Sequence, residues 1–247
     1  MQHVGDQKWL MDQYHFRDIA GSFDELLVLD VTRGRRQSNQ FLSAVAQLAS
    51  TVQVPISAGG GVRSSDGARD LLLSGADKVV YNTALIGASD RLIRIRDTYG
   101  QQSIVASVDV ARTHAGFQVM VHNGTTSTGA LDVYLHDNVL PVAGELLLNS
   151  IDRDGTGRGL DFSLLTALPD GVEQPIVLMG GIGTSEHIVN GLLHPLVDAV
   201  ATSNLLNFMG DGLSAARTSC ELAGVPIPRR LDTTEVMARL SLAPRVG

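Results

Sequence analysis

Short apolar runs alternate with longer segments of helical spacing along almost the whole chain. The apolar runs fall at 25–31, 54–57, 77–82, 103–110, 144–150, 175–180 and 197–203. Most of them are apolar at successive positions, which is typical of parallel strands buried on both faces. Strands that alternate with helices predict an α/β fold built on a parallel sheet. The exception is 117–131, which predicts a small hairpin inserted after the strand that ends at Asp109.

The two halves of the chain resemble each other. The segment GGGVRSSDGARDLLLSGADKVVYNT, from Gly59, matches GGIGTSEHIVNGLLHPLVDAVATSN, from Gly180, at an offset of 121 residues that aligns Gly60 with Gly181. Earlier in each half, DELLVLD matches GELLLNS at an offset of 120 residues. Two half-barrels of strand–helix units predict a (β/α)8 barrel, the TIM-barrel fold.

The chain contains seven predicted strands, whereas eight strands close such a barrel. The repeat partner of the strand at 103–110 falls before Met1, so we expect the first strand to be missing from this chain. Three explanations stay open: the segment 1–15 fills part of the gap, a partner supplies a strand, or translation starts upstream. We favour the upstream start, because the offset places a whole strand before Met1.

Composition limits the possible functions. The 247 residues are 44% hydrophobic and 18% charged, so the chain can bury a sizeable core, and its net charge of −7 argues against a nucleic-acid partner. No apolar run reaches the roughly 18 residues of a membrane span, and a single cysteine, Cys220, suits a reducing compartment. We expect a cytoplasmic protein without a membrane partner. It forms one barrel domain over 1–247, with a core at about 4–215 and a C-terminal extension at about 225–247.

Two glycine-rich turns follow strands at related points of the repeat, one with Gly60 and Gly61 and the other with Gly180 and Gly181. A glycine turn that opens a helix presents free N–H groups and the positive dipole end to an anion. The strands that follow end in small polar residues that could complete such sites, namely Asn82, Thr83, Ser203 and Asn204. Two anion sites at one barrel mouth predict a substrate with a phosphate at each end. The structural alternative is a pair of tight turns with close backbone packing.

Asp109 is the best candidate for a general acid or base. It ends the buried run IVASVD, and burial tends to raise a carboxyl pKa towards a useful range. A helix or turn cap is the structural alternative. The loop NSIDRDGTGRG places Asp154, Gly155 and Thr156 just after another strand. We expect substrate hydrogen bonding and loop closure there, with a solvated turn as the alternative.

Three charged residues, Glu25, Lys78 and Glu145, stand at or near the amino ends of strands. Charges at a barrel floor need partners. They either neutralise one another as a structural cluster or guard a passage along the barrel axis. The sequence shows no metal-ligand spacing and no Ser-His-Asp or Cys-His arrangement, so we expect no metal and no other cofactor.

Six segments occur in an order and spacing that point to one known family: DELLVLDV, ISAGGGVRS, GADKVVYNTA, YGQQSIVASVDV, GELLLNSIDRDGT and MGGIG. Over about residues 4–205 the chain resembles the cyclase subunit of imidazole glycerol phosphate synthase, the HisF family. The resemblance implies an ammonia-using cyclase of histidine biosynthesis. It also implies a HisH-like glutaminase partner at the barrel floor, whose ammonia travels up the axis to a bis-phosphorylated aminoimidazole-carboxamide ribulose substrate.

The resemblance also assigns residues. Asp109 matches one of the family's two catalytic aspartates, and Glu25, Lys78 and Glu145 match three of the four residues of a gate at the floor. In the family, the second aspartate and the gate arginine belong to the first strand, which we expect to be missing from this chain. The segments HNGTTSTG and LLNSIDRDG look closer to a paralogous group associated with amidation of surface-polysaccharide sugars. A histidine cyclase, a glycan-modifying relative and a non-catalytic barrel that binds a glutaminase therefore stay open.

Overall fold

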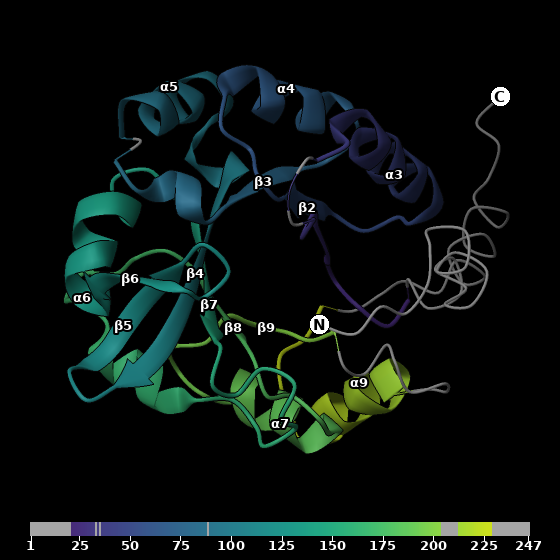
Figure 1. Cartoon of the computed structure of the whole chain (residues 1–247). Coiled ribbons are helices and arrows are strands. Elements are labelled where there is room, and N and C mark those ends of the chain that lie inside the picture. Colours follow the sequence, from purple (N-terminus) through teal and green to yellow (C-terminus); the bar gives the residue numbers. More distant parts are fainter. Residues whose placement is uncertain (1–20, 33, 35, 88, 204–211, 229–247) are drawn as a thin grey trace, which may run out of the picture.

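One curled parallel sheet organises the molecule. The computed structural model describes residues 21–32, 34, 36–87, 89–203 and 212–228. Neighbouring strands on the main path pair in parallel, in the order β1 (Leu26–Leu29), β2 (Ile56–Gly59), β3 (Lys78–Tyr81), β4 (Ile104–Thr113), β7 (Glu145–Ser150), β8 (Ile176–Met179) and β9 (Ala199–Ala201). Figure 1 shows these strands along an arc, with helices outside it. The predicted α/β barrel architecture is confirmed as a curled part-barrel within the described residues.

The connections agree with the sequence pattern. The hairpin predicted at 117–131 is β5 (Gly116–Val121) and β6 (Thr126–Ala130), with β5 antiparallel to β4. The other elements are α3 (Ser38–Thr51), α4 (Ser65–Leu73), η1 (Thr83–Leu85), α5 (Ser89–Tyr99), η2 (Gln101–Ser103), α6 (Leu131–Tyr134), η3 (Leu135–Val139), η4 (Phe162–Ala167), α7 (Ser185–Leu192) and α9 (Gly212–Leu222).

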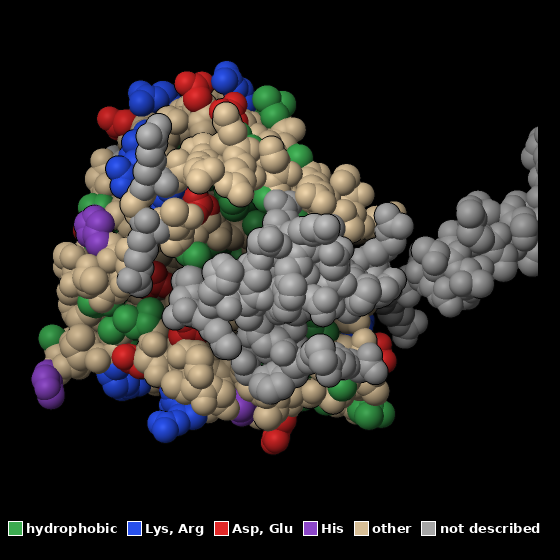
Figure 2. Space-filling model, turned by 45° about the vertical axis from the view of Figure 1, so that its right-hand side comes forward, with side chains coloured by type: hydrophobic (Ala, Val, Ile, Leu, Met, Phe, Trp, Pro, Cys, Tyr) green, Lys and Arg blue, Asp and Glu red, His purple; other side chains and the backbone are tan. Residues whose placement is uncertain are grey.

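Charged side chains of both signs lie on the outer surface of the molecule. On the face shown in Figure 2, basic and acidic side chains are interspersed at the outer edge of the molecule. None of the described helices is long and apolar enough to cross a membrane. The segment 1–15 and most of the expected extension at 225–247 lie outside the described residues.

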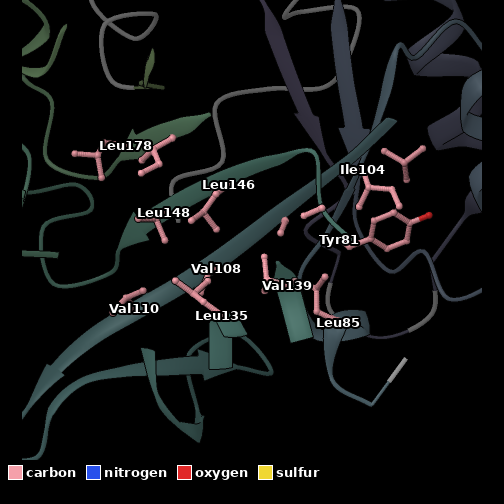
Figure 3. Close-up of a cluster of buried hydrophobic side chains, with 14 of the residues drawn as sticks. Tyr81, Leu85, Ile104, Val108, Val110, Leu135, Val139, Leu146, Leu148 and Leu178 are labelled. Carbon is pink, nitrogen blue, oxygen red and sulfur yellow. The ribbon is translucent and has the colours of Figure 1, made fainter. Parts of the chain in front are cut away.

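Alternation along the strands divides the buried side chains into two clusters. Successive strand residues point to opposite faces of a sheet. Val79 and Tyr81 belong to the large cluster between sheet and helices, whereas Val80 belongs to a small cluster on the inner face. Leu146 and Leu148 likewise point outwards, and their neighbour Leu147 points inwards. Figure 3 shows the outer cluster, where strand side chains meet those of η1 and η3. We call the inner side of the curled sheet the lumen.

The internal repeat is visible in matched contacts. Contacts of the first half recur 120 residues later: the register pair Leu26–Ile56 recurs as Leu146–Ile176, and the side-chain cap from Ser64 on α4 recurs from Thr184 on α7. After the helices the offset becomes 121 residues. There Asp77 and Asp198 each accept a hydrogen bond from the N–H that begins β2 or β8, at 2.8 Å in both halves.

The matched contacts correct the alignment of the glycine turns. A Cβ on Gly60 would lie against the carbonyl oxygen of Asp30, and one on Gly180 would lie against the carbonyl oxygen of Ser150. Gly60 is therefore equivalent to Gly180, not to Gly181 as the sequence alignment predicts. The two halves differ by one residue between the start of this helix and the strand that follows it. A sequence match that aligns the later strands therefore shifts the glycine turn by one residue.

The outer cluster should dominate stability. Leu148 is fully buried there, whereas Leu73 on α4 is 79% exposed. We expect Leu148→Ala to lower the free energy of unfolding by about 2–5 kcal/mol, because it removes buried methyl groups and leaves a cavity. The matched control Leu73→Ala should change it by less than about 0.5 kcal/mol. Urea denaturation measures both, and equal losses would contradict the assignment of Leu148 to the core.

Candidate functional site

Three polar side chains meet at the upper end of the lumen, where β3, β4 and β7 end. Asp109 follows the inward positions of β4 and is paired in register with Asn149 on β7. The amide Nδ2 of Asn149 donates to Asp109 Oδ1 at 2.8 Å, and Nδ2 of Asn82 donates to Asp109 Oδ2 at 3.0 Å. Both carboxylate oxygens of Asp109 are thus held by amide donors. The candidate acid or base has a fixed orientation before any substrate binds.

The electrostatic environment of Asp109 contains opposed effects. Burial raises the pKa of Asp109 above its usual value of 3.8, because the charged form loses hydration. The hydrogen bonds from Asn149 and Asn82 act the other way, and the nearby carboxylate of Asp154 adds to the increase. The net effect is a raised pKa. A carboxyl group whose pKa moves towards neutrality suits proton transfer in either direction.

The structure changes the role of one predicted residue and adds another. Asn82 was expected at an anion site, but its donor group is directed at Asp109. Asn149 was not among the predicted site residues. The signal that could have found it is its position: it follows Glu145 and Leu147 at every second residue, so it faces the lumen at the carboxyl end of the strand.

The first glycine turn lies where β2 leads towards α4. Gly60 and Gly61 have φ values of 112° and 68°, which side chains rarely adopt. A Cβ on Gly61 would lie 2.5 Å from Nε of Arg36, so this guanidinium rests on the turn. The same side chain donates to the carbonyl oxygen of Asp30 at 2.6 Å. The turn therefore combines an exposed backbone with a cation.

The second glycine turn is covered by the loop after β7. Gly180 and Gly181 have φ values of 99° and 93°, and Gly159 N–H donates to the carbonyl oxygen of Gly181 at 2.7 Å. A Cβ on Gly183 would lie 2.9 Å from Cα of Gly157, so the two backbones touch. Glycine is needed here for close approach, whether or not an anion binds. The observed packing supports the structural alternative without removing the anion hypothesis.

The other predicted residues of the upper end have these positions. Asp154, Gly155 and Thr156 form the turn of the covering loop, in which Asp154 N–H donates to the carbonyl oxygen of Ser150 at 3.0 Å. Thr83 begins η1, and its hydroxyl donates to Asn82 Oδ1 at 3.3 Å. Ser203 is exposed after β9, and Asn204 lies outside the described residues. The described residues hold no group of three or more His, Cys, Asp or Glu side chains suited to a metal ion.

The three predicted floor residues meet at the opposite end of the lumen. Lys78 Nζ donates to Glu25 Oε2 at 2.8 Å and to Glu145 Oε2 at 2.7 Å. The hydroxyl of Ser57 also bonds to Glu25. Burial alone would lower the pKa of Lys78, but the bonds to Glu145 and Glu25 raise it overall. The lysine stays charged, and this floor cluster carries one cation between two carboxylates.

An apolar layer separates the floor cluster from Asp109. Its buried members are Val80, Val105 and Leu147, and the partly buried residues packed against them are Leu27, Leu29, Val177, Met179 and Ala201. Ser107, the register partner of Leu147, adds a buried hydroxyl to this layer. The lumen therefore has three levels: charged, mainly apolar and amide–carboxylate. A neutral molecule crosses an apolar level at lower cost than an ion does.

Asp109 should make stability depend on pH. A carboxyl group whose pKa is higher in the folded state stabilises the fold below its ordinary pKa of 3.8, and this contribution is lost as the pH rises through the folded value. Asp109→Asn cannot titrate. We therefore expect the stability of the wild type relative to Asp109→Asn to fall as the pH rises above about 4.

Urea midpoints at a series of pH values measure this difference. Asp170→Asn, at an exposed turn, is the matched control. A pH-independent difference between the wild type and Asp109→Asn would show that the Asp109 environment is not as described.

Comparisons with known proteins agree with the geometry. A family model described as "Histidine biosynthesis protein" matches residues 13–209. The chain is also 43% identical over 223 residues to the "Putative imidazole glycerol phosphate synthase subunit hisF2" of Parasynechococcus marenigrum (strain WH8102), and the match covers 90% of this chain and 82% of that protein. The residues matched by the family model include the floor cluster, the apolar layer and Asp109. With this similarity the chain belongs to the histidine biosynthesis protein family, on its HisF branch.

Proposed function

We propose that this chain is an ammonia-using cyclase that receives ammonia from a glutaminase subunit at its floor. The observation that carries the proposal is the sequence of levels in the lumen. The charged floor cluster is separated by an apolar layer from Asp109, which two amides hold in place. This order suits a neutral nitrogen nucleophile that enters at one end and reacts at the other.

The floor cluster serves as the entrance. Lys78 bridges two carboxylates, and in this proposal the bridge closes the axis while both bonds are intact. Breaking one of them would leave a cation with a single partner, which costs less than exposing an unpaired charge. A partner that binds at the floor could therefore open the lumen by moving one glutamate. The relative named as a synthase subunit supports a partner of this kind.

The substrate is proposed to carry a phosphate at each end. Two glycine turns related by the repeat lie beyond β2 and β8, each followed by a helix with a side-chain cap. Their free N–H groups and helix dipoles favour anions. A bis-phosphorylated aminoimidazole-carboxamide ribulose, the substrate of imidazole glycerol phosphate synthase, has the required two ends. Asp109 would then act as the general acid or base between them.

The decisive comparison uses two nitrogen sources. Lys78→Met removes the cation but keeps a side chain of similar length, so ammonia should escape while the upper end of the lumen is unchanged. With the glutaminase partner present, we expect glutamine-dependent product formation to fall about tenfold or more, equivalent to roughly 1.4 kcal/mol. Turnover with added ammonium salt should stay within about twofold. Product formation from the bis-phosphorylated substrate is the measurement.

Arg94→Met, at an exposed position on α5, is the control for loss of a surface cation. Equal losses with both nitrogen sources would contradict a gate at the floor. A wild-type chain without turnover from either source would overturn the cyclase proposal. If such a chain still stimulated glutamine hydrolysis by its partner, the non-catalytic alternative would replace it, and turnover of a sugar substrate instead would favour the glycan-modifying relative.

A further inference from the structure

Asn149 has one hydrogen-bonding group in use and one free. Its Nδ2 donates to Asp109 Oδ1 at 2.8 Å. Its Oδ1 is buried and has no hydrogen-bond partner among the described residues. A buried acceptor without a partner is unfavourable unless a ligand or water bonds to it. The side chain thus holds Asp109 with one end and offers an acceptor with the other.

The position of Asn149 relates this acceptor to the lumen. Glu145, Leu147 and Asn149 are the successive inward residues of β7, and they belong to the floor cluster, the apolar layer and the upper end. At about 3.3 Å per residue, Asn149 lies about 13 Å above Glu145. A nitrogen that rises past Leu147 passes the buried hydroxyl of Ser107, the register partner of Leu147 on β4, and next meets the oxygens of Asn149 and Asp109.

The carboxylate of Asp109 retains capacity for another donor. Its two oxygens offer about four lone-pair sites, and the amides of Asn149 and Asn82 occupy two of them. The other charged group that acts on it is the carboxylate of Asp154, which adds negative charge. A hydrogen-bond donor, N–H or O–H, is therefore the complementary ligand. Anionic or acceptor-only groups are not.

We propose that Asn149 Oδ1 and the Asp109 carboxylate form a two-acceptor site for ammonia at the upper end of the lumen. The inference rests on the proposed function and adds to it a residue that binds the nucleophile. Ammonia has three N–H groups and one lone pair. With two N–H groups held by Asn149 and Asp109, the lone pair is directed away from both acceptors and towards the substrate side.

Two variants of similar size separate the two ends of the Asn149 side chain. Asn149→Leu removes donor and acceptor together, whereas Asn149→Asp keeps an acceptor and removes the donor. For Asn149→Leu we expect the KM for ammonia, with ammonium salt as the nitrogen source, to rise about tenfold, as loss of a hydrogen bond in a charged site predicts. The KM for the bis-phosphorylated substrate should stay within about twofold. Asn190→Leu, at an exposed position on α7, is the matched control.

A second readout does not require turnover. Carbon-13 NMR of the aspartate carboxyl groups, assigned with Asp109→Asn, follows the titration of Asp109. In Asn149→Leu and Asn149→Asp the pKa of Asp109 should rise further, because the donor that stabilises the charged form is lost. Because either variant suffices, failure of one to fold leaves the titration measurable.

The outcomes are distinguishable. An unchanged Asp109 titration in both variants would overturn the proposal, since the contact would then be absent in solution. A rise in the KM for the bis-phosphorylated substrate with no change in the KM for ammonia would overturn it too, by assigning the acceptor to the sugar. If the wild type turned over neither glutamine-derived nor added ammonia, the proposed function would be wrong, and the ammonia site with it. The titration would still decide whether Asn149 holds Asp109.

Discussion

The parallel register between neighbouring strands decides which side chains meet inside the curled sheet. Because each strand alternates between its two faces, one residue of slippage would move Asp109 and Asn149 out of the lumen. The register pairs Asp109 with Asn149 and, at the other end of the same strands, Val105 with Glu145. The outer face stabilises this arrangement. Its continuous apolar cluster packs against the helices, which leaves the inner face free to hold polar groups.

The two polar ends of the lumen use different physical means to hold charge. At the floor, Lys78 stays charged because two carboxylates offset the cost of its burial. At the upper end no cation among the described residues compensates Asp109, and two neutral amides reduce the cost of its charge without cancelling it. The first arrangement favours a stable closed cluster. The second leaves a carboxyl group with a raised pKa at the carboxyl ends of the strands, which makes it a candidate for proton transfer.

Much of this arrangement could be predicted from the sequence. Strand positions followed from apolar runs, and the hairpin and both glycine turns followed from local patterns, because each depends on neighbours in the chain. The meeting of Glu25, Lys78 and Glu145 followed from their common position at strand starts. Alternation along the strand could have placed Asn149 on the inner face, but not its contact with Asp109, because that contact depends on lateral pairing with a residue forty positions earlier in the chain.

Other differences also arise from tertiary contacts. The shift of one residue between the glycine turns is decided by the backbone against which each glycine packs, which a sequence match does not reveal. The side chain of Arg36 rests on the first glycine turn, in a loop whose basic residues gave no indication of which one would do so. In both cases the sequence specified the element, and packing against a distant strand end specified the contact.

In the proposed function, nitrogen travels through the apolar layer of the lumen to Asp109. Val80→Phe tests it most directly, because Val80 lies in that layer, between Lys78 and Asn82, and the larger ring would obstruct it. The measurement is the ratio of glutamine-dependent to ammonium-dependent turnover in the complex with the glutaminase, a ratio that partial unfolding does not change. We expect this ratio to fall about tenfold, or roughly 1.4 kcal/mol. An unchanged ratio in a folded variant would contradict it.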